Sequence, residues 1–315
     1  MMKRIDTFAL LLAAAILQAC AAGDMDSPGY GTIHFSMEDC TGTRSNTSAE
    51  AYETAIHSLQ VIVADSDGKI ESCRELGGRE SCDIPAKPGD KTVLAVANGP
   101  SFQDCISISQ VLDTEIELTR WNSSADGFVM SGRKQCRVAV DSVSSLGMKL
   151  TRYVSRVRFA SVTSRLPAQY GSLTLTGVML SNAAGNQTIS GDEPVMTWHN
   201  VRGRADEGTM PAILGGKLKR TIGVNTTYTL DTRMYCYPNA TATDTRAILS
   251  VKIQGEDYYY PLSIPHIERN TSYDITLSIY HPGSTDPDIP VSPGYIKVEI
   301  KAGQWDEGPG ITENL

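Results

Sequence analysis

The sequence predicts an all-β protein built from β-sandwiches. Short runs of alternating apolar and polar residues recur along the 315-residue chain, and clusters of Gly, Pro, Asn and Asp separate them. Helical periodicity is almost absent. Hydrophobic residues make up 41% of the chain and charged residues 20%, which indicates a packed core. The length fits two sandwiches of about 120 and 160 residues, with a boundary near residue 150.

The first residues predict export. Two basic residues precede an apolar stretch over residues 8–17, which is too short to span a bilayer and is typical of a signal peptide. Residues 17–20 read Leu-Gln-Ala-Cys, which resembles a bacterial lipobox. The resemblance implies a signal peptide over residues 1–19 and attachment of lipid, such as palmitate, to the thiol of Cys20. An ordinary signal peptide with an incidental cysteine is the alternative.

The strands of the first half are predicted from alternation and from turn residues. Residues 30–37 place Ile33, Phe35 and Met37 on one face of a strand. Further strands are expected over residues 59–63, 69–72 and 91–98, and a hairpin over 127–140. The Asp-Ser-Asp-Gly of residues 65–68 predicts a hairpin turn; it also resembles the start of a calcium loop, but the later ligands are missing.

The second half repeats this style. Strands are expected over residues 152–162, 173–180, 227–237, 247–253, 258–262 and 273–280. The row Tyr258-Tyr259-Tyr260 could stack on a sugar, but neighbouring side chains on a strand point to opposite faces, which favours a packed strand. Asp286-Pro287-Asp288 could hold calcium, and a solvated turn is the simpler interpretation.

Each end of the chain carries a strand on a tether. Residues 38–50 have no periodic apolar signal and include Arg44. Residues 281–294 are rich in proline and glycine and predict a connector. Residues 295–301 then alternate strictly, with the apolar side chains Ile296, Val298 and Ile300 on one face.

The cysteines are consistent with export. Six remain besides Cys20, and a compartment outside the cytoplasm permits disulfides. Only Cys73 and Cys82 are predicted as a pair, because they flank a segment whose Gly-Gly can turn the chain back on itself. The remaining connectivity stays open. The spacings are irregular and poor in histidine, which argues against zinc.

The sequence predicts neither an enzyme nor a cofactor-binding protein. Its five histidines are spread along the chain, and no Gly-x-Ser-x-Gly, His-Glu-x-x-His or phosphate-binding loop occurs. We therefore assign no catalytic residue and no metal site. The net charge of −8 and the lack of a basic block argue against a nucleic-acid partner.

Arg44 suggests a purpose for the first tether. A basic residue in a polar loop is accessible to a trypsin-like protease. A cut between Arg44 and Ser45 would allow the strand over residues 30–37 to leave, and would expose an apolar groove with two strand edges. A strand from another subunit could fill that groove. Three apolar side chains at roughly 1.5–3 kcal/mol each would contribute on the order of 5–9 kcal/mol.

Several short motifs recur in a fixed order along the chain: Thr43-Arg44-Ser45 and the stretches over residues 56–61, 95–98, 128–132, 237–239, 269–273 and 305–308. Each motif is weak alone. Taken in their order, they resemble the fimbrillins of Bacteroidetes, the type V pilins, and the resemblance runs from about residue 20 to the C-terminus.

The resemblance implies two transthyretin-like β-sandwich domains over residues 45–150 and 151–315. It implies a propeptide over residues 20–44, export to the outer membrane as a lipoprotein, and a cut by an arginine-specific protease. The subunits would then polymerise into a fimbrium, shaft or tip, which adheres to a host or bacterial surface ligand. Residues 291–315 would carry the donor strand.

By the same resemblance, Ile33, Phe35 and Met37 form the displaced strand, and Ile296, Val298 and Ile300 form the donor strand. Cys40 departs from this pattern, because a disulfide from Cys40 to the body would hold the first strand after the cut. Two alternatives stay open. One is an uncut fimbrial anchor that keeps its lipid, and the other is a surface lipoprotein that binds glycans.

Overall fold

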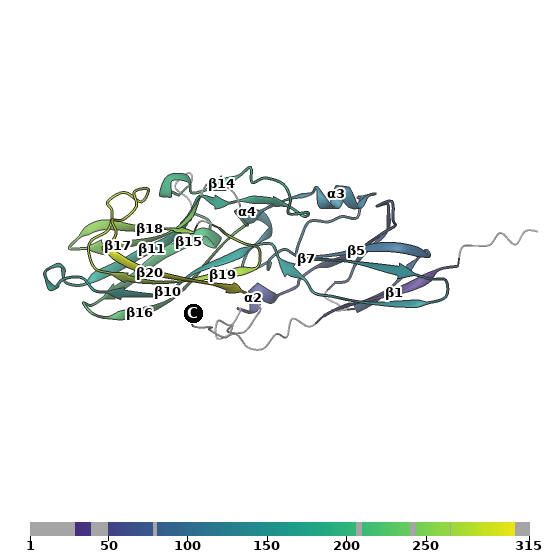
Figure 1. Cartoon of the computed structure of the whole chain (residues 1–315), viewed down its shortest axis with the longest axis horizontal. Helices are drawn as coiled ribbons and strands as arrows, with labels where there is room; N and C mark the ends of the chain where they lie inside the picture. Colours follow the sequence, from purple (N-terminus) through teal and green to yellow (C-terminus); the bar gives the residue numbers. More distant parts are fainter. Residues whose placement is uncertain are drawn as a thin grey trace, which may run out of the picture.

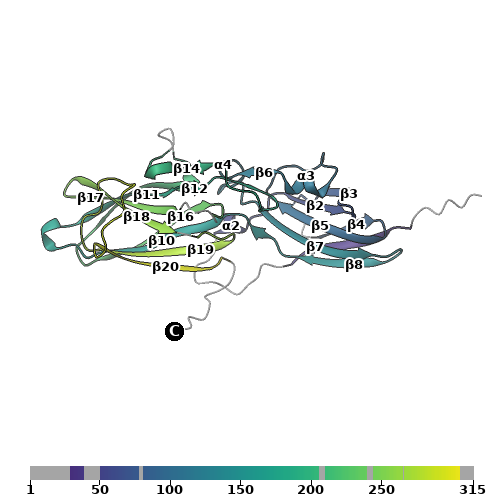
Figure 2. The ribbon, with the colours of Figure 1, turned by 45° about the horizontal axis from the view of Figure 1, so that its top comes forward.

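The structure, a computed structural model, describes residues 29–38, 50–77, 81–205, 210–239, 244–264 and 266–305. Within these ranges the chain consists mainly of β-strands, so the predicted all-β class is confirmed. The strands form two pairs of facing sheets, which lie end to end along the long axis of the molecule (Figures 1 and 2). We call these pairs the first and the second sandwich.

The first sandwich combines a three-stranded and a five-stranded sheet. The three-stranded sheet has the order β4-β1-β8 and the five-stranded sheet the order β3-β2-β5-β7-β9. Their bounds are β1 Gly31–Met37, β2 Leu59–Ala64, β3 Ile70–Glu75, β4 Ser81–Ala86, β5 Gly89–Ala97, β7 Met130–Val138, β8 Val143–Met148 and β9 Thr151–Arg152. Buried side chains of both sheets share one core, in which Ile33 and Phe35 of β1 meet Val61 and Val63 of β2.

The second sandwich pairs two four-stranded sheets, in the orders β16-β10-β19-β20 and β15-β11-β17-β18. Their bounds are β10 Ser155–Ser164, β11 Leu173–Ser181, β15 Gly215–Ile222, β16 Thr227–Cys236, β17 Thr245–Ile253, β18 Glu256–Ile264, β19 Thr271–Ile279 and β20 Ile296–Gln304. Alternation decides the core face of these strands, because every second side chain points inward. Ile275, Leu277 and Ile279 of β19 are fully buried in this way.

Short elements lie between the sandwiches and within their loops. The helices are α2 Ala51–Thr54, α3 Ile108–Leu112 and α4 Leu118–Trp121, and 3-10 turns cover Ala168–Tyr170, Val201–Gly203 and Ala212–Leu214. Two small ribbons pair β6 Glu115–Glu117 with β13 Asn186–Thr188, and β12 Ala183–Ala184 with β14 Trp198–His199. The outer face of the five-stranded sheet joins the core of the second sandwich, so the interior is continuous from one sandwich to the other. Helix α2 lies at this junction (Figure 1).

Most predicted strands are confirmed, and one hairpin prediction is wrong. Residues 130–138 form the single strand β7, because β5 is long enough to pair with it throughout, including at Arg133 and Lys134. The Asp-Gly turn is confirmed: the Asp65 carboxylate accepts hydrogen bonds from the backbone N–H of Asp67 and of Lys69, at 3.0 and 2.9 Å. The packed-strand interpretation of the tyrosine row also holds, since Tyr260 is fully buried.

Candidate functional site

Strand β1 is the middle strand of its sheet. It pairs antiparallel with β4 and parallel with β8, and the pairing is continuous along the whole strand. Ile33 and Phe35 have no exposed surface, and Met37 packs at the edge of the same core. The displaced-strand residues expected from the sequence therefore lie together on the core face of β1.

Removal of β1 would uncover a groove between β4 and β8. Ile84 of β4 lies opposite Ile33, and Leu146 and Met148 of β8 lie opposite Phe35 and Met37. All three groove residues belong to the core of the first sandwich. The strands on either side would also lose their hydrogen-bond partners, which leaves two open sheet edges facing one apolar trough.

Strand β20 lies at the edge of the second sandwich and pairs only with β19. Its apolar residues lie on the core side of the sheet, with Val298 opposite Leu277 and Ile300 opposite Ile275. Because no strand covers the outer side, Val298 and Ile300 remain 36% and 37% exposed. The structure thus confirms the apolar face that the sequence predicts, on a strand with one free edge.

The C-terminal end of β20 is secured by Trp305, which is 2% exposed. Its ring stacks on Tyr235 with the centroids 5.6 Å apart and the planes 15° apart. The guanidinium groups of Arg152 and Arg156 lie 4.7 and 4.9 Å from the ring centroid, within cation–π distance. By contrast, residues 297–304 are all exposed, so the burial of this segment is concentrated in Trp305.

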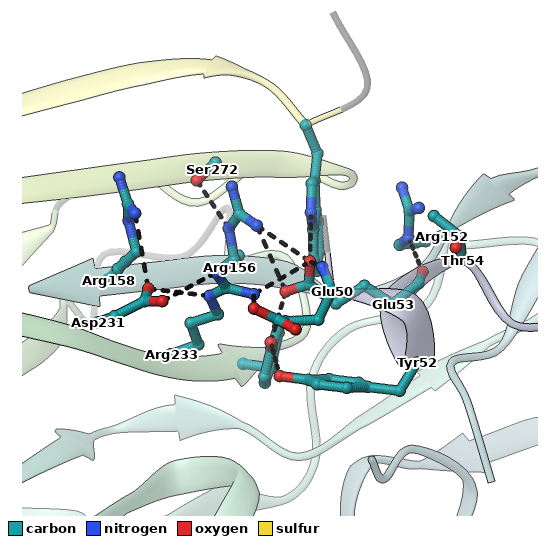
Figure 3. A network of polar contacts seen from close by, with 12 residues as sticks. Glu50, Tyr52, Glu53, Thr54, Arg152, Arg156, Arg158, Asp231, Arg233 and Ser272 are labelled. Carbon is teal, nitrogen blue, oxygen red and sulfur yellow. Dashed lines mark hydrogen bonds and ion pairs between the residues drawn. The ribbon is translucent and has the colours of Figure 1, made fainter. Parts of the chain in front are cut away.

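A buried carboxylate, Glu53 of α2, joins the two halves of the chain (Figure 3). Its Oε1 accepts a hydrogen bond from the Tyr235 hydroxyl at 2.6 Å, and its Oε2 faces Arg156 Nη1 at 3.1 Å. Trp305 Nε1 donates to the same Oε2 at 3.4 Å. The side chain also caps its own helix, since Glu50 N donates to it at 2.7 Å. These partners offset the loss of hydration that burial imposes on the carboxylate.

Charged residues of alternating sign extend this network along the sheet. Arg233 contacts Glu50 at 2.9 Å and Asp231 at 3.1 Å, and Arg158 donates to Asp274 at 2.7 Å. Burial, together with the nearby Glu53 charge, raises the pKa of Tyr235 well above its usual range. The raised pKa keeps the Tyr235 hydroxyl protonated, so that it can donate its hydrogen bond to Glu53.

A cavity of about 270 Å³ borders this junction. Tyr52, Phe128, Tyr235 and Arg233 line it, so it lies beside the aromatic stack that holds Trp305. The described residues contain no cluster of three or more His, Cys, Asp or Glu side chains that could hold a metal ion. Nor is any helix of the described part of the chain long and apolar enough to cross a membrane.

Several predicted site residues lie outside the described residues: Cys20, Cys40, Arg44 and Ser45. Lipidation and the cut therefore stay predictions. Cys73 and Cys82 are described, and both are free thiols here. Cys73 packs against the core shared with the second sandwich and Cys82 against the core of the first. Burial and then the charge of Cys105 raise the pKa of Cys73. The Cys73–Cys82 disulfide stays a prediction.

Sequence reasoning missed the Glu53 cluster. A single glutamate in a four-residue helix carries no pattern that marks it as buried. One signal was present. The stretch before and within the predicted core strand contains three arginines, Arg152, Arg156 and Arg158, although arginine is seldom fully buried without a partner. Buried cations require a buried anion, and Glu53 supplies it.

Comparison with known proteins identifies the fold. No family model matches the chain. A putative cell adhesion protein from Bacteroides eggerthii superposes with a TM-score of 0.71 at 16% identity, over 88% of this chain and 97% of that one. A fimbrilin from Porphyromonas gingivalis gives 0.67 at 17% identity, over 90% and 99%. A tip fimbrial protein from the same species, with a C-terminal truncation, gives 0.53 at 14% identity, over 88% and 100%. The chain has a fimbrillin-family fold.

Loss of the buried carboxylate should destabilise the junction. We expect Glu53→Gln to lower the free energy of unfolding by about 3–5 kcal/mol, because Arg156 would keep its buried charge without its partner. Glu50→Gln is the control, since the Glu50 side chain is 50% exposed and should change stability by less than about 0.5 kcal/mol. Urea unfolding followed by circular dichroism measures both; equal small effects would contradict the role given to Glu53.

Loss of the buried indole should loosen β20. We expect Trp305→Ala to speed amide exchange in β19 and β20 by about 100-fold or more, because little else in β20 is buried. Exchange in β2 and β5 should stay near that of the wild type. Lys301→Ala, on the exposed part of β20, is the control. Native-state hydrogen exchange by mass spectrometry reads all four strands, and unchanged exchange in β20 would show that the ladder alone holds it.

Proposed function

We propose that this protein is a structural subunit of a fimbrium, shaft or tip, which supports adhesion. The proposal rests on the fold: two of the similar structures are fimbrial proteins and one is a putative cell adhesion protein. These are structural proteins rather than enzymes, which fits the lack of catalytic motifs in the sequence. The partners of this chain would be other copies or related subunits.

The position of β1 is the observation that carries the proposed assembly. A middle strand with two buried apolar residues follows the predicted signal peptide and Cys20, and Arg44 comes seven residues after Met37. A cut between Arg44 and Ser45 by an arginine-specific protease would separate β1 from the rest of the chain. The groove between β4 and β8 would then accept a donor strand from another subunit.

β20 supports the other half of this mechanism. It has the required alternation, it lies at a sheet edge, and its apolar side chains are already one-third exposed. Ile296, Val298 and Ile300 would take the places of the displaced apolar residues. Before the cut, lipid on Cys20 would hold the protein at the outer membrane, and cutting would pass it to the cell-surface fimbrium.

Two alternatives predict different uses of the same strands. A membrane-retained anchor would keep β1 and would have no need of a donor strand. A glycan-binding lipoprotein would use a surface site, and a cavity of about 470 Å³ favours it as the second candidate. Trp121, His57 and Asp126 line this cavity, and the Arg120 guanidinium lies 5.1 Å from the Trp121 ring.

Cleavage and polymerisation test the proposal directly. Trypsin treatment of the lipid-free protein should cut after Arg44 and yield ladders of oligomers on gels run without boiling, because the cut allows β1 to leave. Arg44→Ala is the control and should stay monomeric. Mass spectrometry identifies the cut, and sedimentation gives the size. A chain that is cut and freed of β1 yet stays monomeric at high concentration would contradict the assembly.

A charge on the donor face should separate assembly from folding. We expect Val298→Lys to leave the monomer stable to within about 1 kcal/mol, because Val298 is already partly exposed and a lysine can extend into water. Polymerisation after the cut should be lost, since the groove is apolar. Tyr295→Lys introduces a lysine on the other face of the same segment, where the side chain is 41% exposed, and should polymerise normally. Equal polymerisation of both variants would exclude β20 as the donor.

A further inference from the structure

The groove does not select the direction of an incoming strand by hydrogen bonding alone. β1 runs antiparallel to β4 and parallel to β8, so β4 and β8 run antiparallel to each other. A strand inserted in either direction would therefore form one parallel and one antiparallel ladder. Both ladders satisfy the backbone groups of the groove. The direction must be decided by side chains.

At Gly31 of the groove, backbone atoms leave no room for a Cβ, whereas Gly29 is crowded only by the side chain of Val140, which is exposed. A Cβ on Gly31 would lie 2.5 Å from Val138 Cγ1 and closer than van der Waals contact to the Ala139 carbonyl oxygen. The backbone of residues 139–142 borders Gly31, and hydrogen bonds to β1 and the residue before it hold this backbone in place. Thr32 N donates to Ser142 O at 2.8 Å, and Asp141 N donates to Tyr30 O at 3.1 Å. A side chain cannot be accommodated without breaking these bonds.

The C-terminal segment carries a glycine at the matching distance. β1 reads Gly-Thr-Ile-His-Phe-Ser-Met over residues 31–37, and residues 294–300 read Gly-Tyr-Ile-Lys-Val-Glu-Ile. In both segments the glycine precedes the first of three alternating apolar residues by two positions. Gly294 therefore falls on Gly31 when Ile296 falls on Ile33. Pro293, which then replaces Tyr30, retains the carbonyl that Asp141 N needs.

The reverse direction fails the same test. The glycine that follows β20's apolar residues is Gly303, three positions after Ile300. With Gly303 at the crowded position, an odd spacing would turn Ile296, Val298 and Ile300 away from the core. Only insertion in the direction of β1 satisfies both the crowded position and the apolar face.

We propose that the donor strand enters the groove in the direction of β1 and in the register that places Gly294 on Gly31. This inference rests on the proposed function and adds its geometry. In this register Ile296 faces Ile84 of β4, and Lys297 takes the place of His34, whose ring contacts Asp83 at 2.6 Å. Gly294 is then a specificity-determining residue, because every other register of residues 291–302 would place a side chain at the crowded position.

The proposed register also supplies a carboxylate near Lys134 at the end of the groove that lies beyond Met37. Lys301 takes the place of Glu38, whose carboxylate contacts Lys134 at 2.9 Å. Lys301 alone would repel Lys134. Glu299 lies two residues earlier on the same outward face, where it provides the carboxylate that this end of the groove needs.

Substitution of Gly294 tests the register. Gly294→Ala and Gly294→Asn should each slow polymerisation of the cut protein by about tenfold or more, because either Cβ would overpack the groove. In the monomer Gly294 has φ +88 and no atom within 4 Å of an added Cβ, and asparagine tolerates positive φ. The Asn variant therefore keeps the monomer unstrained. Gly303→Ala, which also has open space around it, is the matched control and should polymerise like the wild type.

The outcomes separate the two proposals. If the wild type polymerises and both Gly294 variants polymerise at the same rate, the register is wrong and the donor-strand function stands. If the wild type does not polymerise after loss of β1, the proposed function itself fails. Slow polymerisation of both variants, with Gly303→Ala unaffected and the Gly294→Asn monomer as stable in urea as the wild type, supports the register.

Discussion

The structure depends on one buried carboxylate, that of Glu53. It lies in a short helix between the two sandwiches and binds Arg156 of β10, the hydroxyl of Tyr235 and the indole of Trp305. These partners come from the second sandwich and from the end of β20, while Glu53 itself follows the N-terminal tether by only a few residues. Three distant parts of the chain thus share one buried carboxylate, and a shift of any of them would remove one of its partners.

The two terminal strands differ in how they are held. β1 is buried between two neighbours and contributes two fully buried side chains to the first core. β20 has one neighbour and depends on Trp305 at its end. The first strand is therefore paired along both edges, whereas the last strand has one open edge and few buried side chains. This contrast matches the roles of a removable strand and a donor strand in the proposed assembly.

Much of the fold was predictable from sequence, because period-two alternation depends only on neighbouring residues. It located β1 with Ile33 and Phe35 inward, and it located β20 with its apolar face. The predicted hairpin over residues 127–140 failed because the length of the partner strand, β5, decides where β7 ends. Pairing order and the burial of Glu53 also depend on residues far apart in the chain, which alternation cannot report.

The free edge of β20 bears on how assembly outside the cell could be driven. In its own subunit the strand satisfies backbone groups along one side only. In the proposed groove both sides would be paired, and the partly exposed Val298 and Ile300 would become buried. Transfer would thus be downhill for the strand, with no nucleotide required as an energy source. The favourable free energy of filling the groove would thus be available from folding itself, because the subunit folds around a strand that it later releases.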